Sequence, residues 1–380
     1  MKKNYLLAPG PVQAPSEVLL SMAKPLIHHR TAQFEEKFAK VQKLLKELFM
    51  TQRPVITFAS SGTGAMEAAI VNCHSAADEV LIVRGGKFGE RWGEISEAYG
   101  LKPVYIDIKW GGGLNVEDVE NALKSNPNIK SVMMQYSETS TAAMHDVEKT
   151  AQIVSKTNAL LIVDAISALG VVPLKSDDWK IDVIVGGSQK SLMLPPGLSF
   201  LWFSERAEEK MKSANLPKYY FNAQAELKAL KKNTTAYTPA ITLIDGLYTS
   251  LMMMKEYGWQ NLYDKNKKLM KAIHAGLDAL NIKLFSSSPS VSVTAGVVPE
   301  GIDGERLVND LKEIYGVTIA GGQDEVKGKI FRVGTLGYVD SSDIVVFFAA
   351  LEGCLKKQNY SFEWGVGVGA AEEILYGENS

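Results

Sequence analysis

Residues 159–191 read ALLIVDAISALGVVPLKSDDWKIDVIVGGSQKS. This stretch contains two short apolar runs, Ala159–Asp164 and Asp182–Gly186, separated by a loop-rich connection. Both runs are apolar on both faces, as strands are when helices cover both sides of their sheet. Asp164 ends the first run and Lys190 follows the second. The stretch therefore predicts two strands of one buried sheet, with a carboxylate and an amine projecting into one crevice.

The same pattern extends through the N-terminal two thirds of the chain. Helix-like segments, such as residues 116–124 and 147–157, are long enough to cross between parallel strands. Repeated alternation of this kind predicts an α/β fold with a mostly parallel sheet in three layers. Ligands bind at the carboxyl ends of the strands in such sheets, so the residues after each run are candidates for a site. The other apolar runs are Val55–Ala59, Glu79–Val83, Pro103–Ile106, Ser131–Gln135 and Leu198–Phe203.

The pattern changes after about residue 240. Residues 260–280 have leucine and isoleucine on one face of a long amphipathic helix. Short strands and two further helices follow, and Ser341–Asp343 offers N-cap chemistry for the last helix. We therefore predict a large domain of residues 15–255 and a smaller α+β domain of residues 256–380 together with residues 1–14. The further strands are expected at 283–285, 291–297 and 330–333, and the helices at 305–315 and 341–357.

Composition excludes several classes of protein. The 380 residues include 41 Lys and Arg against 43 Asp and Glu, a net charge of -2, which removes the electrostatic case for nucleic-acid or polybasic membrane-surface binding. The longest uncharged stretch, residues 284–299, is serine-rich and contains two prolines, so no spanning helix is expected. Residues 9–11, Pro-Gly-Pro, interrupt the N-terminus before a signal peptide can form. We expect a cytoplasmic protein without nucleic-acid or membrane partners.

The cysteine content argues against a disulfide framework or a metal centre. Cys73 and Cys354 are the two cysteines, too few for a disulfide framework or a four-ligand zinc site. The five histidines are scattered, apart from the pair His28 and His29. We therefore expect no metal site.

Asp164 and Lys190 are more informative together than apart. Alone, Asp164 is equally well explained as a helix N-cap, and Lys190 as a solvated loop residue. Together at strand ends of one sheet they fit a specific chemistry. A lysine that forms Schiff bases needs a desolvated pocket, and the ring nitrogen of pyridoxal phosphate stays protonated only beside an anion.

A candidate phosphate site follows the run that begins at Val55. Residues 60–65 read SSGTGA and open a helix-like stretch, so backbone N–H groups, hydroxyls and the helix N-terminus can receive an anion. The segment lacks the Gly-Lys-Ser/Thr ending of a nucleotide-binding P-loop. Taken alone, the segment is equally well an ordinary tight turn. In series with Asp164 and Lys190, it predicts a cofactor phosphate cradle.

Three further residues fit the same site. Phe88 can stack on a pyridine ring, although a core aromatic explains it equally well. Thr139 can donate its hydroxyl to the ring oxygen, or serve an ordinary turn. Arg332 lies within an apolar strand, where it must be paired either with a substrate carboxylate or with a structural acid.

The chain resembles the class V aminotransferases, which are fold type I pyridoxal-phosphate enzymes. The resemblance runs from about Leu7 to about Cys354, and the branch it favours is the alanine–glyoxylate and serine–glyoxylate, or serine–pyruvate, aminotransferases. It implies a homodimer, pyridoxal 5'-phosphate as cofactor, and amino acid and 2-oxo acid substrates. The segments that carry it are APGPV, SSGTGAMEAA, GGKFGERWG, SETSTA, LLIVDAISALGVVPL, GGSQKSLMLPPGLSF and IFRVGTLGY.

The resemblance also implies residue roles. Lys190 matches the Schiff-base lysine and the general base, Asp164 the partner of the ring nitrogen, and Arg332 the substrate-carboxylate arginine. In residues 233–240, Thr235 is our choice for a contact to the neighbouring subunit's phosphate, which would place the active sites at a dimer interface. The other cofactor positions are Ser61, Gly62, Thr63 and Gln189 for the phosphate, Ile166 and Phe88 for the ring faces, and Thr139 for the ring oxygen.

Alternative activities on the same scaffold remain open. A cysteine desulfurase is disfavoured, because residues 320–329, where its nucleophile is expected, contain no cysteine. Phosphoserine aminotransferase would need further basic residues, for which His28–Arg30 is a candidate, and a lyase would use the same Asp164 and Lys190. A non-catalytic scaffold has no need of a desolvated lysine. The sequence shows no clear second arginine for a distal carboxylate, so we expect alanine or serine as the amino donor.

Overall fold

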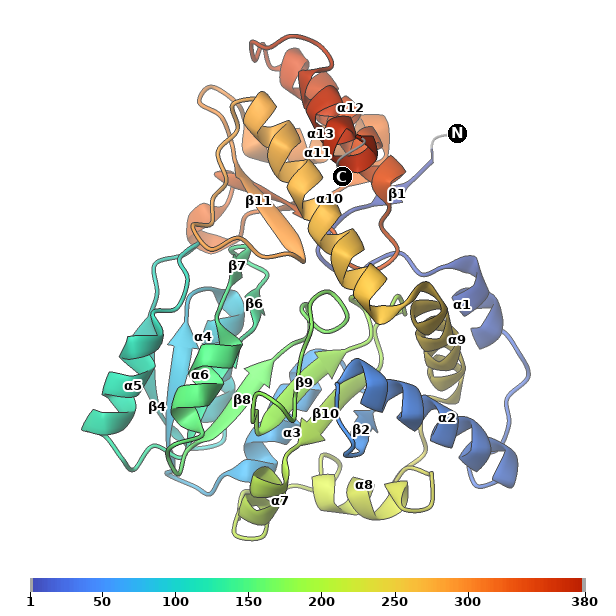
Figure 1. The fold of residues 1–380 in the computed structure, drawn as a ribbon, viewed down its shortest axis with the longest axis vertical. Coiled ribbons are helices and arrows are strands. Elements are labelled where there is room, and N and C mark those ends of the chain that lie inside the picture. The colour runs from blue at the N-terminus through green and yellow to red at the C-terminus, as the bar shows by residue number, and fades with distance from the viewer. Residues whose placement is uncertain (1–2, 378–380) are drawn as a thin grey trace.

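The computed structural model describes residues 3–377, and its centre is a seven-stranded sheet (Figure 1). The strand order is β2-β10-β9-β8-β5-β3-β4, and only β10 runs antiparallel to its neighbours. All seven apolar runs form strands, so the predicted mostly parallel sheet is confirmed. The strands are β2 (Val55–Phe58), β3 (Glu79–Arg84), β4 (Lys102–Asp107), β5 (Ser131–Gln135), β8 (Leu160–Asp164), β9 (Val183–Gly187) and β10 (Ser199–Phe203).

Helices cover both faces of this sheet. In Figure 1, α6 lies in front of the sheet and α3 behind it, and their contacts are with β8 and with β9 and β10 respectively. Every residue of β8 and β9 is buried as a result. The layers are therefore those of the expected α/β fold. The helices are α1 (Ser16–Met22), α2 (Ala32–Leu48), α3 (Gly62–Cys73), α4 (Lys87–Ala98), α5 (Val116–Ser125), α6 (Val147–Val154), α7 (Glu205–Met211), α8 (Ala223–Leu230) and α9 (Ile241–Tyr257).

The C-terminal part mixes helices with small sheets. Three antiparallel strands have the order β11-β14-β13, and the N-terminal strand β1 pairs in parallel with β12. The beginning of the described chain therefore joins its C-terminal part (Figure 1). The elements are β1 (Tyr5–Leu6), α10 (Trp259–Ala279), β11 (Val293–Val297), α11 (Gly304–Tyr315), β12 (Val317–Thr318), β13 (Ala320–Gly321), the 3-10 helix η1 (Asp324–Val326), β14 (Ile330–Gly334), α12 (Ser341–Lys357) and α13 (Val366–Tyr376); β6 (Ser137–Glu138) and β7 (Ala143–Met144) form a separate hairpin.

Two main hydrophobic cores underlie this arrangement. One lies around the central sheet, and the other lies among α10, α11, α12 and α13. The long helix α10 reaches both, because Leu262 belongs to the first core whereas Leu269, Ile273 and Leu277 belong to the second. On these cores we propose the division into residues 15–255 and residues 256–380 with 1–14.

Three local features differ from the sequence expectations or extend them. Residues 283–285 form no strand, and Leu284 makes a single bridge to Gly296. The N-cap of α12 is Asp340 rather than Ser341, because Asp340 is extended and its carboxylate accepts the N–H of Asp343 in a reciprocal capping box. The tail forms α13, which packs on α10. No helix within residues 3–377 is long and apolar enough to span a bilayer.

Candidate active site

Asp164 and Lys190 lie at the carboxyl end of two adjacent strands. Asp164 is the last residue of β8, and Lys190 follows the end of β9, which pairs with β8 in parallel. Only 5% of Asp164 and 9% of Lys190 are exposed. Burial raises the pKa of Asp164 to about 7, against the opposing effect of an N–H donated by Ile166 at 2.8 Å. Burial, with smaller effects of Arg332 and Arg91, lowers the pKa of Lys190 to about 8 against the opposing charge of Asp164.

The N-terminal segment closes over the lysine. Lys190 Nζ donates a hydrogen bond to the carbonyl of Pro9. A Cβ atom on Gly10 would lie 2.3 Å from Nζ, and Gly10 has a φ of +111°, so only glycine fits there. Pro9-Gly10-Pro11 was expected to interrupt the N-terminus and belongs to the resembling segment APGPV, but neither observation relates it to Lys190. Its function as the wall beside Lys190 was missed, because nothing local in the sequence relates position 10 to position 190.

The first turn of α3 has the features of an anion site. Ser61 is the N-cap residue, but its side chain makes no capping hydrogen bond. Gly62 is required by packing, since a Cβ there would lie 2.3 Å from Ile166 Cδ1. Gln189 extends toward the same region: its Oε1 is buried and has no hydrogen-bond partner among the described residues, and it lies 3.2 Å from where a Cβ on Gly187 would be. Free backbone N–H groups and an idle hydroxyl suit a phosphate, to which Gln189 could donate only through Nε2, since its Oε1 is an acceptor.

The candidate ring-binding residues surround the crevice between Asp164 and the cradle. The Ile166 side chain packs against both Gly62 and Gly187. Thr139 Oγ1 lies 2.9 Å from Ser167 Oγ, and Ser167 in turn donates to the carbonyl of Ser137 at 3.2 Å. Either hydroxyl can be the donor in the Thr139–Ser167 pair, and when Ser167 donates, the Thr139 proton is free for a ligand. The Thr139 hydroxyl is therefore held in place by a neighbour that the sequence analysis did not single out.

Phe88 is positioned by a buried glutamate that sequence reasoning also missed. Glu138 is fully buried and accepts the N–H of Phe88 at 3.1 Å and that of Gly89 at 3.0 Å. It also accepts a hydrogen bond from the Ser140 hydroxyl. Burial is the main cause of the raised pKa of Glu138. The glutamate lies inside the motif SETSTA, but its contact joins it to Phe88, 50 positions away, so no local pattern indicates its role.

Arg91 is the second arginine near the crevice. Its guanidinium lies over the Phe88 ring, 4.9 Å from the centroid, and Nη1 donates to Thr63 Oγ1 at 3.3 Å. No ion pair joins it to another residue in the range 3–377. Thr63 is a predicted phosphate position, so Arg91 adds positive charge beside the cradle.

Arg332 is buried without an acidic partner. Its Nε and Nη2 donate to the carbonyl of Gly321 at 3.0 and 2.8 Å, and Nη1 donates to the carbonyl of Thr139 at 2.9 Å. No carboxylate of the described chain forms an ion pair with it, so the structural salt bridge that we considered is not present. Desolvation lowers the pKa of Arg332. Glu138 opposes that effect from a distance, but only neutral carbonyls accept from the guanidinium, so it can still pair with an incoming carboxylate.

Thr235 is engaged within its own chain. Its hydroxyl donates to the carbonyl of Tyr237 at 2.6 Å, and 5% of the residue is exposed. Thr238 in the same segment is exposed. The contact of residues 233–240 to a neighbouring subunit stays a prediction.

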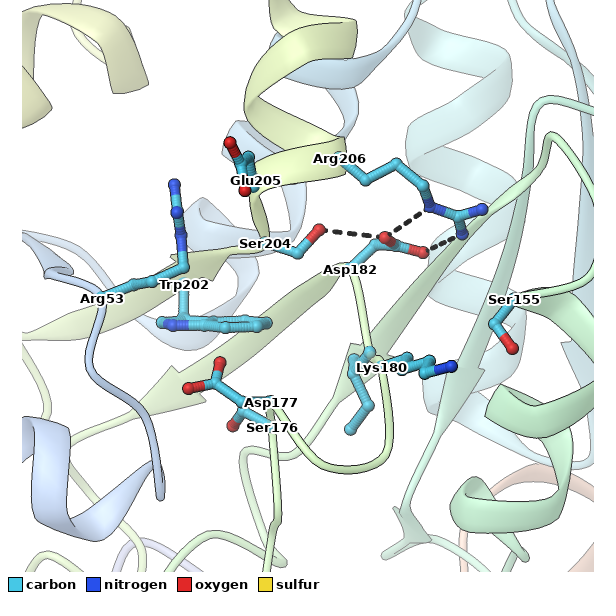
Figure 2. Close-up of a pocket in the computed structure, with 11 residues that line it drawn as sticks. Arg53, Ser155, Ser176, Asp177, Lys180, Asp182, Trp202, Ser204, Glu205 and Arg206 are labelled. Carbon is cyan, nitrogen blue, oxygen red and sulfur yellow. Dashed lines mark hydrogen bonds and ion pairs between the residues drawn. The ribbon is translucent and has the colours of Figure 1, made fainter.

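A different cavity lies at the opposite, amino end of the strands (Figure 2). It has a volume of about 620 Å³, and Asp182, just before β9, lies at its wall. Figure 2 shows that Asp182 accepts hydrogen bonds from Arg206 and from the Ser204 hydroxyl. Arg53 is likewise paired with Glu208. The charges of Asp182 and Arg53 in this lining are therefore neutralised within the protein.

The cysteines and acids do not assemble into a metal-binding group. Cys73 and Cys354 are both buried, one in each main core. Among residues 3–377, no three side chains of the His, Cys, Asp or Glu type are grouped to hold a metal ion.

Comparison with known proteins identifies relatives along the whole chain. The family model described as Aminotransferase class-V matches residues 4–344. The chain is 41% identical to the "Soluble hydrogenase, small subunit" of Synechococcus sp. (strain PCC 6716), over 98% of each chain. It is 32% identical to the L-aspartate–glyoxylate aminotransferase of Paracoccus denitrificans (strain Pd 1222), over 98% of this chain and 96% of that one. The crystal structure of ureidoglycine–glyoxylate aminotransferase from Bacillus subtilis superposes with a TM-score of 0.93 at 29% identity, over 98% of both chains.

Proposed function

This chain belongs to the class-V aminotransferases, and we propose that it transfers the amino group of a small neutral L-amino acid, alanine or serine, to a 2-oxo acid such as glyoxylate or pyruvate. The observation that carries the proposal is that Lys190 is desolvated and feels the charges of both Asp164 and Arg332, while neither Asp164 nor Arg332 forms an ion pair within residues 3–377. Each of these costs stability in the protein alone. Each is relieved by a ligand of the expected chemistry.

The residues present fit pyridoxal 5'-phosphate. Asp164 lacks a cation that a protonated ring nitrogen would provide, and the first turn of α3 lacks an anion that a phosphate would provide. Ile166 and Phe88 would lie at the ring faces, and Thr139 at the ring oxygen. When bound, the cofactor supplies an aldehyde and an electron-withdrawing ring that stabilises negative charge at the substrate's α-carbon.

Lys190 is suited to hold and move a proton at neutral pH. Since its pKa is lowered to about 8, an appreciable fraction of the amine is neutral there, as a general base for the substrate's α-proton requires. The Pro9 carbonyl and Gly10 confine the amine to one direction. The same wall limits the entry of water to the amine.

Arg332 would orient the substrate through its α-carboxylate. Its guanidinium is held between Thr139 and Gly321, so the fork is fixed before the substrate arrives. A carboxylate can then displace or share these carbonyl contacts in a bidentate geometry. Lys87, the partly buried residue that precedes Phe88, is already paired with Glu90 and Asp324. Arg91, the other cation beside Phe88, donates to Thr63 at the phosphate cradle. We expect neither cation to serve a distal carboxylate, which supports a neutral donor side chain.

We also propose a homodimer with shared active sites. Leu19 and Leu20 in α1 and Leu26 after it are exposed, with 70% of Leu20 and 67% of Leu26 accessible. A group of exposed leucines of this kind is typical of a protein interface, and a dimer would bury it. Light scattering of the purified chain tests this directly. The cytoplasmic location stays a prediction from the sequence.

The test of the activity is an absorption spectrum of the purified protein with pyridoxal phosphate, repeated with each amino donor. L-alanine or L-serine should convert the visible band to the pyridoxamine form faster than L-aspartate, L-glutamate or phosphoserine, and glyoxylate or pyruvate should restore it. Lys190→Ala should lack the wild-type band. A protein that cannot be loaded with the cofactor would contradict the proposal and favour a scaffold; faster conversion by aspartate would contradict the donor class alone.

A further inference from the structure

A second cavity, of about 470 Å³, lies between the two proposed domains behind the segment that carries Lys190. We refer to it as the interdomain cavity. Pockets for small organic ligands commonly have volumes of about 300–1,000 Å³. Its lining contains none of the residues assigned above to the cofactor or substrate. The residues that matter below are Met193, Met253 and Met254 from one domain and Lys265, Asn266, Asp340 and Asp343 from the other.

One wall of the interdomain cavity is apolar and adaptable. It consists of Met193, Met253, Met254 and Leu262. Methionine side chains are unbranched and polarisable, so they conform to apolar groups of different shape. This wall suits an aliphatic or thioether side chain.

Lys265 supplies the same cavity with a cation that forms no ion pair within residues 3–377. Its Nζ has one hydrogen bond, a long one of 3.3 Å to the carbonyl of Gly337. No ion pair joins it to another residue of the described chain. Desolvation lowers the pKa of Lys265, while the more distant Asp340 and Asp343 oppose that effect. At least two of its three N–H bonds are free for an anionic ligand.

Acceptor groups lie beside this cation. Asn266 is 3% exposed; its Nδ2 donates to the carbonyl of Leu262 at 2.8 Å, which fixes the amide orientation, and its Oδ1 has no partner. Asp340 and Asp343 each use one carboxylate oxygen in the capping box of α12 and keep the other. The cavity therefore offers the Lys265 ammonium group, several hydrogen-bond acceptors and an apolar wall.

We propose that the interdomain cavity binds a free apolar α-amino acid as a zwitterion, a site that goes beyond the proposed transamination. The carboxylate pairs with Lys265, the ammonium faces Asn266 Oδ1 and the aspartates, and the side chain lies on the methionines. A simple anion would meet the two aspartates, and a simple cation would meet Lys265. Only a ligand that carries both charges compensates both sets.

Occupancy of this cavity has a direct route to the catalytic segment. Gly337, whose carbonyl accepts from Lys265, lies so close to Lys190 that a Cβ on it would be 3.3 Å from the Lys190 carbonyl. Ser191, the next residue, lines the cavity itself. A ligand that contacts both domains therefore restrains both their arrangement and the backbone that holds Lys190.

The test is calorimetric titration of L-leucine into the cofactor-loaded protein that carries Arg332→Gln, which removes the substrate-carboxylate contact of the active site. We expect saturable binding of one molecule per chain. The analogues 4-methylpentanoate, which lacks the ammonium, and 3-methylbutylamine, which lacks the carboxylate, should each bind at least tenfold more weakly. On the same background, Lys265→Gln should weaken L-leucine binding at least tenfold.

Lys267→Gln is the matched control, because Lys267 is an exposed lysine of the same helix, and it should change binding less than twofold. Met253→Ala is a second variant, which should weaken L-leucine binding about threefold or more. It tests the site independently if Lys265→Gln fails to fold. Absence of saturable heat, or heat that neither Lys265→Gln nor Met253→Ala changes, would overturn the proposal. Equal binding of 4-methylpentanoate would contradict the zwitterion.

Discussion

Two buried aspartates lie at opposite ends of adjacent strands and are treated in opposite ways by the fold. Asp182, at the amino end of β9, accepts from Arg206, from the Ser204 hydroxyl and from the N–H of Leu161 (Figure 2). Asp164, at the carboxyl end of β8, accepts one backbone N–H and has no ion pair within residues 3–377. Asp182 therefore has an ion-pair partner within the protein, whereas Asp164 can form one only with a ligand.

The arginines show the same contrast. Arg206 is paired with Asp182 and also donates to the carbonyls of Thr157 and Ala159, so it ties α7 to the sheet. Arg332 is the more buried of the two, yet only carbonyls accept from it. A buried charge without its counter-charge is costly, and such groups mark functional sites more often than structural ones. Buried charges therefore occur at both ends of the sheet, and the two ends differ in whether those charges form ion pairs.

The largest effect should come from Lys190→Ala, at the carboxyl end of the strands, where the buried charges form no ion pairs. A general base contributes about 10²–10⁴-fold, so we expect kcat for the best donor to fall ~10³-fold or more. The midpoint of thermal unfolding of the apoprotein should not fall, because a desolvated amine is removed. Steady-state kinetics and calorimetry check both. A kcat within tenfold of wild type would contradict the assignment.

Paired Asp→Asn substitutions test the contrast directly. Asp164→Asn should lower kcat on the order of 100-fold and leave the apoprotein as stable as wild type or more so, because burial disfavours the Asp164 charge more than Lys190 and Arg91 favour it. Asp182→Asn should leave kcat within about twofold but destabilise the protein by about 3 kcal/mol, since the Arg206 charge loses its partner. Asp164→Asn should therefore have the larger effect on kcat, and Asp182→Asn the larger effect on the free energy of unfolding. The same change at both sites would refute the distinction.

The pH dependence of stability should differ between the wild type and Asp164→Asn. The folded-state pKa of Asp164, about 7, lies above its unfolded value of about 3.9, so the folded state holds the proton more tightly. Its favourable contribution is complete below pH 4 and is lost as the pH rises through 7, by about 4 kcal/mol. Asp164→Asn should remove that part of the slope in the apoprotein. Urea denaturation at pH 4.5, 6 and 7.5 measures it, and the contribution of Glu226, whose burial also raises its pKa to about 7, cancels in the comparison.

The sequence predicted the elements of the fold better than the partners within the site. All seven strands of the central sheet and the α10 periodicity could be recognised, because apolar runs and helical spacing are local signals, although the edge strand β4 is not buried as expected. Lys190 and Asp164 could be recognised because they follow strands of one sheet. Gly10, Glu138 and Arg91 could not, since each acts through contact with a residue far along the chain. The N-cap of α12 was misplaced by one residue because Asp340 and Ser341 have similar capping chemistry.

The smallest expected effect concerns Ser204, which serves the completed end in two ways. Its Oγ accepts the N–H of Ala207 as the N-cap of α7, and it donates to Asp182. Ser204→Ala should therefore cost about 1–2 kcal/mol of stability, the usual cost of losing a cap, with kcat and KM unchanged. Ser204→Asp would keep the cap but place a second carboxylate beside Asp182, so it should be less stable than Ser204→Ala. If Ser204→Asp were the more stable variant, the charge of Asp182 would have to be more than neutralised by Arg206, and the amino end would then be an anion site rather than a completed ion pair.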